Sequence, residues 1–134
     1  MVAELDDITE SYEWGCFDSD VSGADGLDIG TGLQNSLDIV EGCSDTNCAA
    51  YMSLNAVKEG YTDWYLPSRY KLSEMSNTIG SRGSQGNIGS FENNHYWSSS
   101  ESSNTKAWAV LFNWGSPSKR GKTNSHRVRV IRDF

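Results

Sequence analysis

The sequence predicts an α+β fold in which two helices pack on small, mostly antiparallel sheets joined by long irregular loops. Apolar residues recur at helical spacing only in the middle of the chain, whereas the alternation typical of strands appears only in its last third. Between these segments lie runs rich in serine, asparagine and glycine, which indicate extended loops. Because no repeat or linker interrupts the 134 residues, we interpret residues 1–134 as a single domain.

The first third, residues 1–47, is expected to be irregular with short strands, because its apolar residues are isolated and turn-forming residues fill its second half. Helices are expected at 48–59 and 68–79, and a glycine directly follows each of them. Ser68 is a suitable N-cap for the second helix. The apolar residues at helical spacing are Cys48, Met52 and Ala56 in the first helix, and Leu72, Met75 and Ile79 in the second.

The last third is expected to form strands, with residues 107–113 and 127–132 in one small sheet and a further short strand at 96–100. Alternation along the strand that begins at Trp108 separates two faces. We expect the face formed by Trp108, Val110 and Phe112 to lie in the core. Trp97, from the preceding short strand, is also expected to be buried. We expect the other face to point outward, formed by Ala109, Leu111 and Asn113.

Composition and charge exclude several classes of protein. Only 37% of residues are hydrophobic, and no apolar run approaches the roughly 20 residues of a transmembrane helix, so we expect no membrane insertion. The acidic first residues contain no apolar segment of the kind found in secretory signals, and the sequence leaves the localisation open. The low sequence pI, about 4.7, argues against nucleic acid as a partner.

The charge is unevenly placed along the chain. Residues 1–66 contain 14 acidic residues and one basic residue, whereas residues 67–134 contain 4 acidic and 10 basic residues, which together give the net charge of −7. We prefer the interpretation that an acidic half covers a basic half within one fold. A basic face for an anionic ligand is the alternative.

The three cysteines, Cys16, Cys43 and Cys48, form no closed disulfide framework. Cys43 and Cys48 are close enough in sequence to bridge, and three reduced, buried thiols are the other possibility. A zinc site made from these cysteines with His95 and His126 lacks the usual ligand spacing. Asp18 and Asp20 imitate the start of a calcium loop, but the closing glutamate of such a loop is missing, so they are a weak calcium candidate.

Neither a catalytic set nor a cofactor motif is present in the sequence. The glycine- and serine-rich segment 80–86 has no preceding strand to make it a nucleophile elbow, and the glycines that follow lack the Lys-Ser/Thr of a phosphate loop. We therefore expect a protein that is not an enzyme and that needs no cofactor.

A display surface for a ligand is the remaining functional interpretation. Small polar side chains with a few aromatic and arginine residues are typical of adaptable binding surfaces. Trp114, next to a glycine in a predicted turn, is hard to bury and favours binding. We expect one contiguous patch that binds a protein or glycan ligand. Its residues are Ser102, Asn104, Ala109, Leu111, Asn113, Trp114, Ser116, Ser118, Arg120, Thr123, Ser125 and His126.

Four segments carry a resemblance to a known family. They are 60–68 (with Asp63-Trp64 and Leu66-Pro67-Ser68), 96–100 (Tyr-Trp-Ser-Ser-Ser), 107–112 and 127–132. Over about residues 14–134 the chain resembles the Lcl C-terminal domain family, which is named after a collagen-like adhesin. One departure is Lys71, where the family usually has a glutamate that completes a capping box with the preceding serine.

The resemblance implies a C-type lectin-like fold of the formylglycine-generating-enzyme subclass. Neither the sugar-binding calcium motifs of true C-type lectins nor a paired-cysteine active site is visible in the sequence. The resemblance therefore implies the fold without lectin or oxidase chemistry.

The C-terminal segment, about 96–134, also resembles the variable proteins of diversity-generating retroelements. In those proteins adenine-directed mutagenesis rewrites asparagine codons, which yields residues such as Ser, Thr, His, Arg, Ala and Leu but neither Trp nor Lys. The expected function is therefore a receptor-recognition module with diversified contacts, placed at a viral or prokaryotic cell surface. The alternative is a fixed-specificity adhesin or phage tail-fibre tip that binds an anionic polysaccharide through Arg82, Lys119, Arg120 and Lys122.

Overall fold

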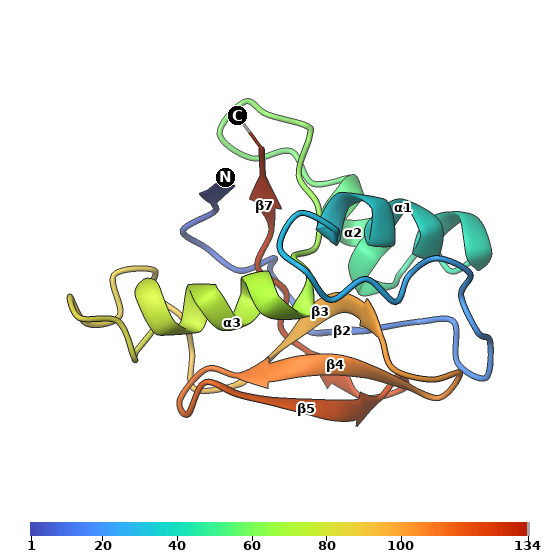
Figure 1. The fold of residues 1–134 in the computed structure, drawn as a ribbon. Helices are drawn as coiled ribbons and strands as arrows, with labels where there is room; N and C mark the ends of the chain where they lie inside the picture. The colour runs from blue at the N-terminus through green and yellow to red at the C-terminus, as the bar shows by residue number, and fades with distance from the viewer. Residues whose placement is uncertain (134) are drawn as a thin grey trace.

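Helices and short antiparallel strands are segregated along the chain in the computed structural model, which describes residues 1–133 (Figure 1). The helices are α1 (Gly32–Gly42), α2 (Ala49–Leu54) and α3 (Arg69–Thr78). The strands are β1 (Val2–Ala3), β2 (Tyr12–Glu13), β3 (His95–Glu101), β4 (Lys106–Leu111), β5 (Ser116–Gly121), β6 (Ser125–His126) and β7 (Ile131–Arg132). The predicted α+β class is confirmed.

A three-stranded antiparallel sheet, ordered β3-β4-β5, forms the largest β element. Two further antiparallel pairs, β1 with β7 and β2 with β6, join the beginning of the chain to its end. The segment after β6 runs beside β3, because the Arg127 backbone N–H donates to the His95 carbonyl (3.1 Å) and the Trp97 N–H donates to the Arg127 carbonyl (2.9 Å). Of the predicted strand at 127–132, only Arg127 pairs with β3, whereas Ile131 and Arg132 form β7, which pairs with β1. The expectation that 107–113 and 127–132 share one sheet was therefore wrong, because the N-terminal strand β1 supplies the partner of β7.

Helix α3 matches the helix expected at 68–79. Ser68 caps it, and its side-chain oxygen accepts a hydrogen bond from the Lys71 backbone N–H at 3.4 Å. Leu72 and Met75 are buried against the aromatic residues of the three-stranded sheet. Figure 1 shows α3 lying across one face of that sheet.

Helix α2 is shorter than the 48–59 expected from the sequence. It ends at Leu54, and the chain then reverses in a two-residue turn in which Glu59 and Gly60 have φ of +53° and +80°. A β-bridge between Lys58 and Tyr61 closes this turn. Residues 55–59 are therefore needed for the reversal and cannot continue the helix.

Helix α1 lies in the segment that we expected to be irregular, and that expectation was wrong. Its buried side is formed by Gly32, Asn35, Ser36 and Ile39. Leu33 and Leu37, which have helical spacing in the sequence, are instead exposed. Asn35 donates to the Gly26 carbonyl at 2.7 Å. A side chain at Gly32 would come within 2.8 Å of the Leu66 carbonyl, so a glycine is required for this close approach.

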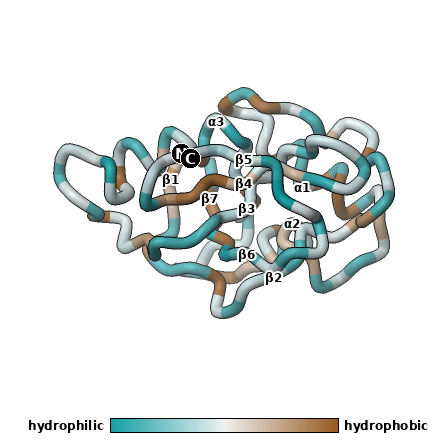
Figure 2. Tube along the Cα trace, turned by 90° about the horizontal axis from the view of Figure 1, so that it is seen from below, coloured by the Kyte–Doolittle hydropathy of each residue, from teal (hydrophilic) through white to brown (hydrophobic). Residues whose placement is uncertain are grey.

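Large aromatic side chains form much of the core. Trp97 and Phe112 are fully buried, as predicted. The expectation that Trp108 is largely buried was wrong: it lies on the central strand β4 but is only half-buried, covered by the charged side chains of Arg69 (4.0 Å from its ring) and Lys119 (5.5 Å). In Figure 2 the hydrophobic trace around β7 lies inside the molecule, whereas the outer loops are largely hydrophilic.

The disulfide joins Cys16 to Cys43, which neither of the expected cysteine arrangements included. Cys48 is a buried free thiol, and burial raises its pKa. The expected Cys43–Cys48 bridge is wrong, because the fold brings Cys16 beside the end of α1, a contact between residues 27 positions apart that spacing alone cannot reveal.

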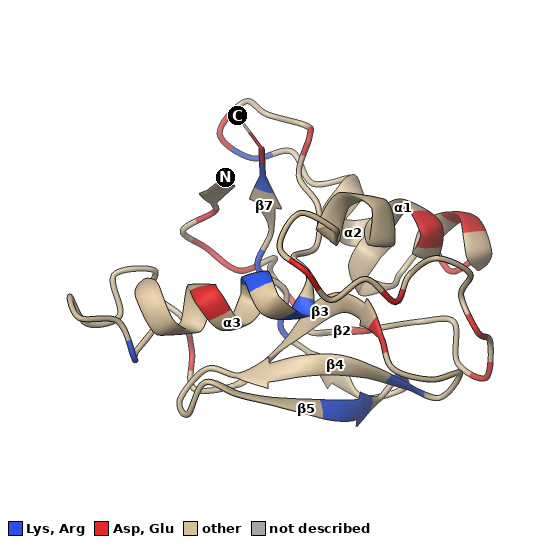
Figure 3. Ribbon diagram, in the orientation of Figure 1, with Lys and Arg blue, Asp and Glu red and all other residues tan. Residues whose placement is uncertain are grey.

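Ion pairs join the acidic and basic halves of the chain. Asp7 pairs with Arg127 (3.1 Å) and Arg129 (2.8 Å), and Asp63 pairs with Arg132 (2.6 Å). Figure 3 shows acidic residues along α1 and the neighbouring loops, and basic residues on β4, β5 and β7. These pairs support the interpretation that the acidic half covers the basic half.

Candidate functional site

The face of the three-stranded sheet that points away from α3 gathers several of the predicted ligand-binding residues. Residues opposite one another in antiparallel strands share a face, and the register places His95 opposite Leu111 and Leu111 opposite Ser116. Further along, Ala109 lies opposite Ser118 and Ala107 opposite Arg120. We call the accessible part of this surface the histidine face; it consists of His95, Leu111, Ser116, Ser118, Arg120 and His126.

One prediction for this face was wrong. Ala109 was expected to be exposed, but it is fully buried in the core cluster that also contains Trp97 and Val128. The alternation correctly separated the two faces of β4. It could not show that the segment after β6 and the N-terminal residues around Tyr12 and Trp14 pack over the middle of the outward face.

The remaining predicted residues lie near the two ends of the β4–β5 hairpin, on either side of the histidine face. Ser102, Asn104 and Thr123 lie near one end of the β4–β5 hairpin, where Lys106 pairs with Gly121. Asn113 and Trp114 lie in the turn at its opposite end. The six paired residues of β4 separate these ends by about 20 Å, at roughly 3.3 Å per residue. Asn113 and Trp114 therefore adjoin the histidine face at Leu111 and Ser116, whereas Ser102, Asn104 and Thr123 lie at the far end of the hairpin.

At the first end, Asn104 donates a hydrogen bond to Asp18 at 3.0 Å, and both residues line a shallow depression with Asp20 and Ser102. Within residues 1–133 the structure brings together no group of three acidic, histidine or cysteine side chains suited to a metal ion. The weak calcium candidate, Asp18 and Asp20, is therefore not supported by the geometry.

At the opposite end, Trp114 is 66% exposed, as its position beside a glycine indicated. Gly115 has φ of +67°, and a side chain there would meet Arg82 at 2.6 Å. Trp114 thus lies near Arg82 and the C-terminal end of α3, in a turn at one end of the histidine face.

The two histidines form the centre of the candidate site. Their ring centroids are 5.1 Å apart, and the His126 ring also meets the Trp97 ring edge-on at 4.7 Å. His126 Nε2 and Arg120 Nε are buried and have no hydrogen-bond partner among the described residues. Beside them is a pocket of about 320 Å³, lined by Ser11, Asn94, His95, Ser125, His126 and Arg127.

The environment keeps both imidazoles neutral at physiological pH. Burial, together with smaller contributions from the neighbouring His95 and Arg120, lowers the pKa of His126 to about 4. Burial and the charge of Arg120 also hold the pKa of His95 below its usual value. Neutral imidazoles can both donate and accept hydrogen bonds, so the pocket can recognise polar groups of a ligand.

Sequence reasoning missed His95, Asn94 and Ser11 as site residues. A signal for His95 was present, because it precedes Tyr96 and alternation places it on the same face as Trp97. Nothing in the sequence near Ser11 showed that β2 would pair with β6 and bring it to the pocket.

The basic residues named for an anionic polysaccharide do not share a surface. Lys122 is fully buried and pairs with Glu101 at 2.7 Å, so it cannot contact a ligand. Lys119 alternates with Arg120 along β5 and points to the other face, where it lies 5.5 Å from the Trp108 ring. The expected set of four polysaccharide contacts is therefore wrong, and only Arg120 of that set belongs to the histidine face.

The model of the Lcl C-terminal domain family matches residues 9–132 of this chain. No curated protein matches it at a significant level. None of the helices in residues 1–133 has the length and hydrophobicity that crossing a membrane requires.

Proposed function

Because the chain belongs to the Lcl C-terminal domain family, we propose that it is a receptor-recognition module whose histidine face binds a protein or glycan ligand. Family membership is compatible with a ligand-binding or adhesin-like module. We further propose that its scaffold is the C-type lectin-like fold implied by the resemblance. A position at a cell surface or on a virion would suit this role.

The single observation that carries this proposal is the set of unpartnered polar atoms on an accessible strand face. His126 Nε2 and Arg120 Nε are withdrawn from water and have no protein partner among the described residues. Unpaired buried polar groups cost free energy, so a ligand that supplies an acceptor to the Arg120 Nε–H and a polar group to His126 Nε2 is favoured. The surrounding hydroxyl groups of Ser116 and Ser118 add small, adaptable hydrogen-bonding groups.

We also propose that the face is diversified by a retroelement. Support comes from the alternation along β5. Ser116, Ser118 and Arg120 point to the histidine face and are residue types that adenine-directed mutagenesis of an asparagine codon produces. Lys119 points to the other face and is a type that it cannot produce. On β4 the same division holds: Leu111, a type that the mutagenesis produces, lies on the histidine face, and Trp108, a type that it cannot produce, lies on the other face.

The gene tests the diversification directly. We expect an adenine-rich near-copy of its 3′ end beside a reverse transcriptase gene, with the differences at adenines of the template. These differences should fall in the codons of the histidine face and spare those of Tyr96, Trp97, Val110 and Phe112. A unique 3′ end with no near-copy would contradict the proposal of diversification.

Binding without turnover is part of the proposal. Among residues 1–133 no hydroxyl or thiol is hydrogen-bonded to the His95 or His126 side chain, so neither imidazole is placed to activate a nucleophile. The purified protein should show no hydrolase or oxidase activity. A reproducible activity that His126→Ala or Ser84→Ala abolishes would contradict this.

A fixed-specificity adhesin or tail-fibre tip remains the alternative, and one observation favours it. Arg120 supplies a guanidinium with an unpartnered Nε on the same face as two histidines, an arrangement suited to a sulfate or carboxylate of a polysaccharide. Binding of heparin-like and uronate-rich glycans by the wild-type protein, lost in Arg120→Gln, together with a constant gene end, would support this alternative.

A further inference from the structure

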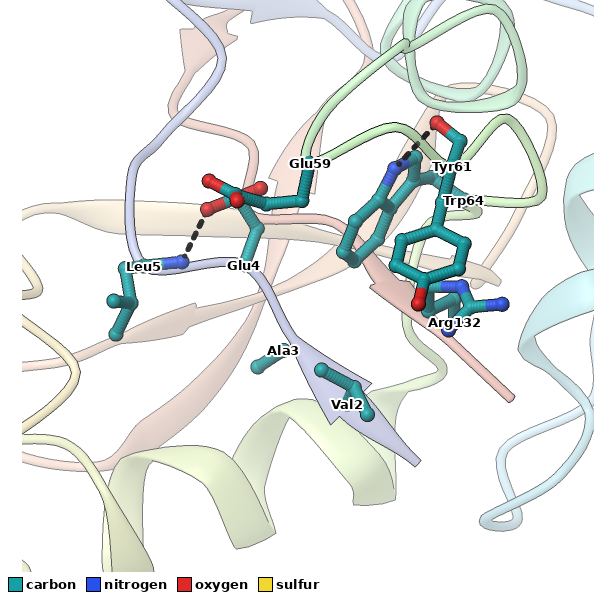
Figure 4. Close-up of a pocket in the computed structure, with 8 residues that line it drawn as sticks. All are labelled: Val2, Ala3, Glu4, Leu5, Glu59, Tyr61, Trp64 and Arg132. Carbon is teal, nitrogen blue, oxygen red and sulfur yellow. Dashed lines mark hydrogen bonds between the residues drawn. The ribbon is translucent and has the colours of Figure 1, made fainter. Parts of the chain in front are cut away.

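A second pocket, of about 430 Å³, lies beside the two chain ends and shares no residue with the histidine face. In Figure 1 the chain ends lie at the top of the molecule, whereas β4 and β5 lie at the bottom. The volume falls within the range of small-molecule sites. Its lining residues are Val2, Ala3, Glu4, Leu5, Glu59, Tyr61, Trp64 and Arg132 (Figure 4).

The floor of this pocket contains a buried carboxylate with one unsatisfied oxygen. Glu4 is only 6% exposed, and its Oε1 accepts a hydrogen bond from the Leu5 backbone N–H at 2.7 Å. Its Oε2 is buried and has no hydrogen-bond partner, and no basic side chain of residues 1–133 forms an ion pair with this carboxylate. A buried carboxylate without a cation is costly, so the site favours a positively charged occupant.

A second carboxylate lies at the mouth of the pocket. Glu59 is exposed and occupies the first position of the two-residue turn, with φ of +53°, where asparagine or glycine is the usual choice. Figure 4 shows the Glu4 and Glu59 carboxylates on one side of the pocket, with Tyr61 and Arg132 on the other side.

Aromatic rings supply the remaining walls. The Trp64 Nε1–H donates to the Lys58 and Tyr61 carbonyls, at 3.2 and 3.1 Å, so the indole is fixed in place and its N–H is already bonded. The Arg132 guanidinium lies 3.7 Å from the centre of the Tyr61 ring, so one face of this ring already makes a cation–π contact.

The positive charge of Arg132 does not neutralise the two glutamates. Asp63 holds this guanidinium through two hydrogen bonds, from Nε at 2.6 Å and from Nη2 at 3.0 Å. Its charge is therefore compensated within that pair. The pocket retains an uncompensated negative charge next to apolar walls.

From these contacts we infer that the pocket binds an alkylammonium group, either of a free small amine or of a lysine side chain in a peptide. The ammonium would donate to Glu4 Oε2 and be attracted by Glu59, while the alkyl stem would lie against Trp64 and Tyr61. This site goes beyond the proposed function, because it uses none of the residues of the histidine face.

Titration of the whole protein with n-butylammonium, followed by the NMR signal of the Trp64 indole N–H, tests this inference. We expect saturable binding with a dissociation constant near 1 mM, of the size expected for a charged fragment. n-Butanol, which has the same stem without the charge, should bind at least about tenfold more weakly.

Variants separate the role of the buried carboxylate from a general effect of charge. Glu4→Gln keeps the acceptor for the Leu5 N–H and should weaken n-butylammonium binding by about tenfold or more. Glu41→Gln, an equal charge change at an exposed position of α1, should leave it unchanged. Circular dichroism of both variants checks that each is folded.

Three results would overturn the inference: no saturable shift with n-butylammonium, equal affinity for n-butanol, or unchanged affinity in folded Glu4→Gln. If Glu4→Gln does not fold, Glu59→Gln and Tyr61→Ala, both at exposed positions, must each weaken binding for the inference to stand. Tighter binding of Nα-acetyl-lysine amide than of n-butylammonium would identify a peptide lysine as the source, and the reverse would identify a free amine.

Discussion

The two faces of β4 contact different surroundings, although adjacent residues of one strand supply them. On the helix face, Val110 and Phe112 are fully buried against Tyr96 and the apolar side of α3. On the histidine face, Leu111 is half-buried beside His95 and Ser116, and buried nitrogens of His126 and Arg120 have no partner. The helix face is therefore fully packed against other parts of the protein, whereas the histidine face presents polar groups without hydrogen-bond partners to a ligand.

This difference indicates which positions of the sheet can be substituted without loss of the fold. Apolar side chains on the helix face fill space between packed elements, and truncating them leaves cavities. Side chains at the accessible rim of the histidine face contact few neighbours, so their identity affects binding more than folding. Beneath that rim, however, Trp97 and Ala109 are as buried as any residue of the helix face.

The largest effect on stability is expected at Trp97, which is buried beneath the accessible residues of the histidine face. Trp97→Ala should lower the free energy of unfolding by about 3–5 kcal/mol, because it removes a fully buried ring and leaves a cavity. It also leaves the Tyr12 carbonyl without the indole donor that lies 2.7 Å away. Urea denaturation measures this change. A decrease in the free energy of unfolding of less than about 1 kcal/mol would contradict tight packing beneath the histidine face.

A slightly smaller effect is expected where β5 ends and the chain turns inward. Lys122→Ala should cost about 3 kcal/mol, because Glu101 would remain buried without its partner at 2.7 Å. The exposed Lys119→Ala is the matched control and should change the stability by less than about 0.5 kcal/mol. Equal costs in thermal or urea unfolding would show that Lys122 is no more constrained than the accessible residues.

Acid should lower the free energy of unfolding because His126 in the histidine face takes up a proton more readily in the unfolded chain. The pKa of His126 is about 4 in the folded protein and near 6.5 in the unfolded chain, so the unfolded chain binds more protons between these values. The stability contributed by neutral His126 is therefore complete above about pH 6.5 and is lost as pH falls toward 4. Because the ring is partly accessible, we expect a loss of about 1–2 kcal/mol. Urea unfolding of wild type and His126→Asn at several pH values should show a smaller loss in the variant, and parallel profiles would contradict the role of His126.

The smallest effects are expected at the rim itself. Ser116→Tyr, Ser118→Thr and Leu111→Ser should each change the free energy of unfolding by no more than about 0.5–1 kcal/mol, since these side chains are exposed or half-buried. Thermal melting of the three variants checks this. Losses above 2 kcal/mol at two of them would place the histidine face among the packed surfaces.

Local signals explain how much of the fold the sequence could predict. Helix α3 was found because its cap, Ser68, and its apolar stripe are encoded within the helix itself. Helix α1 was missed although Leu33, Leu37 and Val40 recur at helical spacing, and its buried side is formed instead by Asn35 and Ser36 through hydrogen bonds to distant backbone.

The candidate site was predicted only in part for the same reason. The sequence indicated Ser116, Ser118 and Arg120 as ligand contacts in a polar segment between two strands. It did not indicate β5, the strand that places them on one face, because β5 has no apolar alternation. The burial of Ala109 and the pocket beside His126 depend on the pairing of β2 with β6, which joins residues more than a hundred positions apart. Such pairings leave no local pattern in a chain of short strands.

The central claim, that the histidine face is a variable ligand surface on a fixed scaffold, is tested most directly by two matched libraries. One library diversifies Leu111, Ser116, Ser118 and Arg120, and the other diversifies Leu72, Tyr96, Val110 and Phe112 with the same codons. Displayed variants are scored by resistance to protease, which reports folding. The account predicts that most members of the first library remain resistant and that few members of the second do. Similar losses of resistance in both libraries would contradict it.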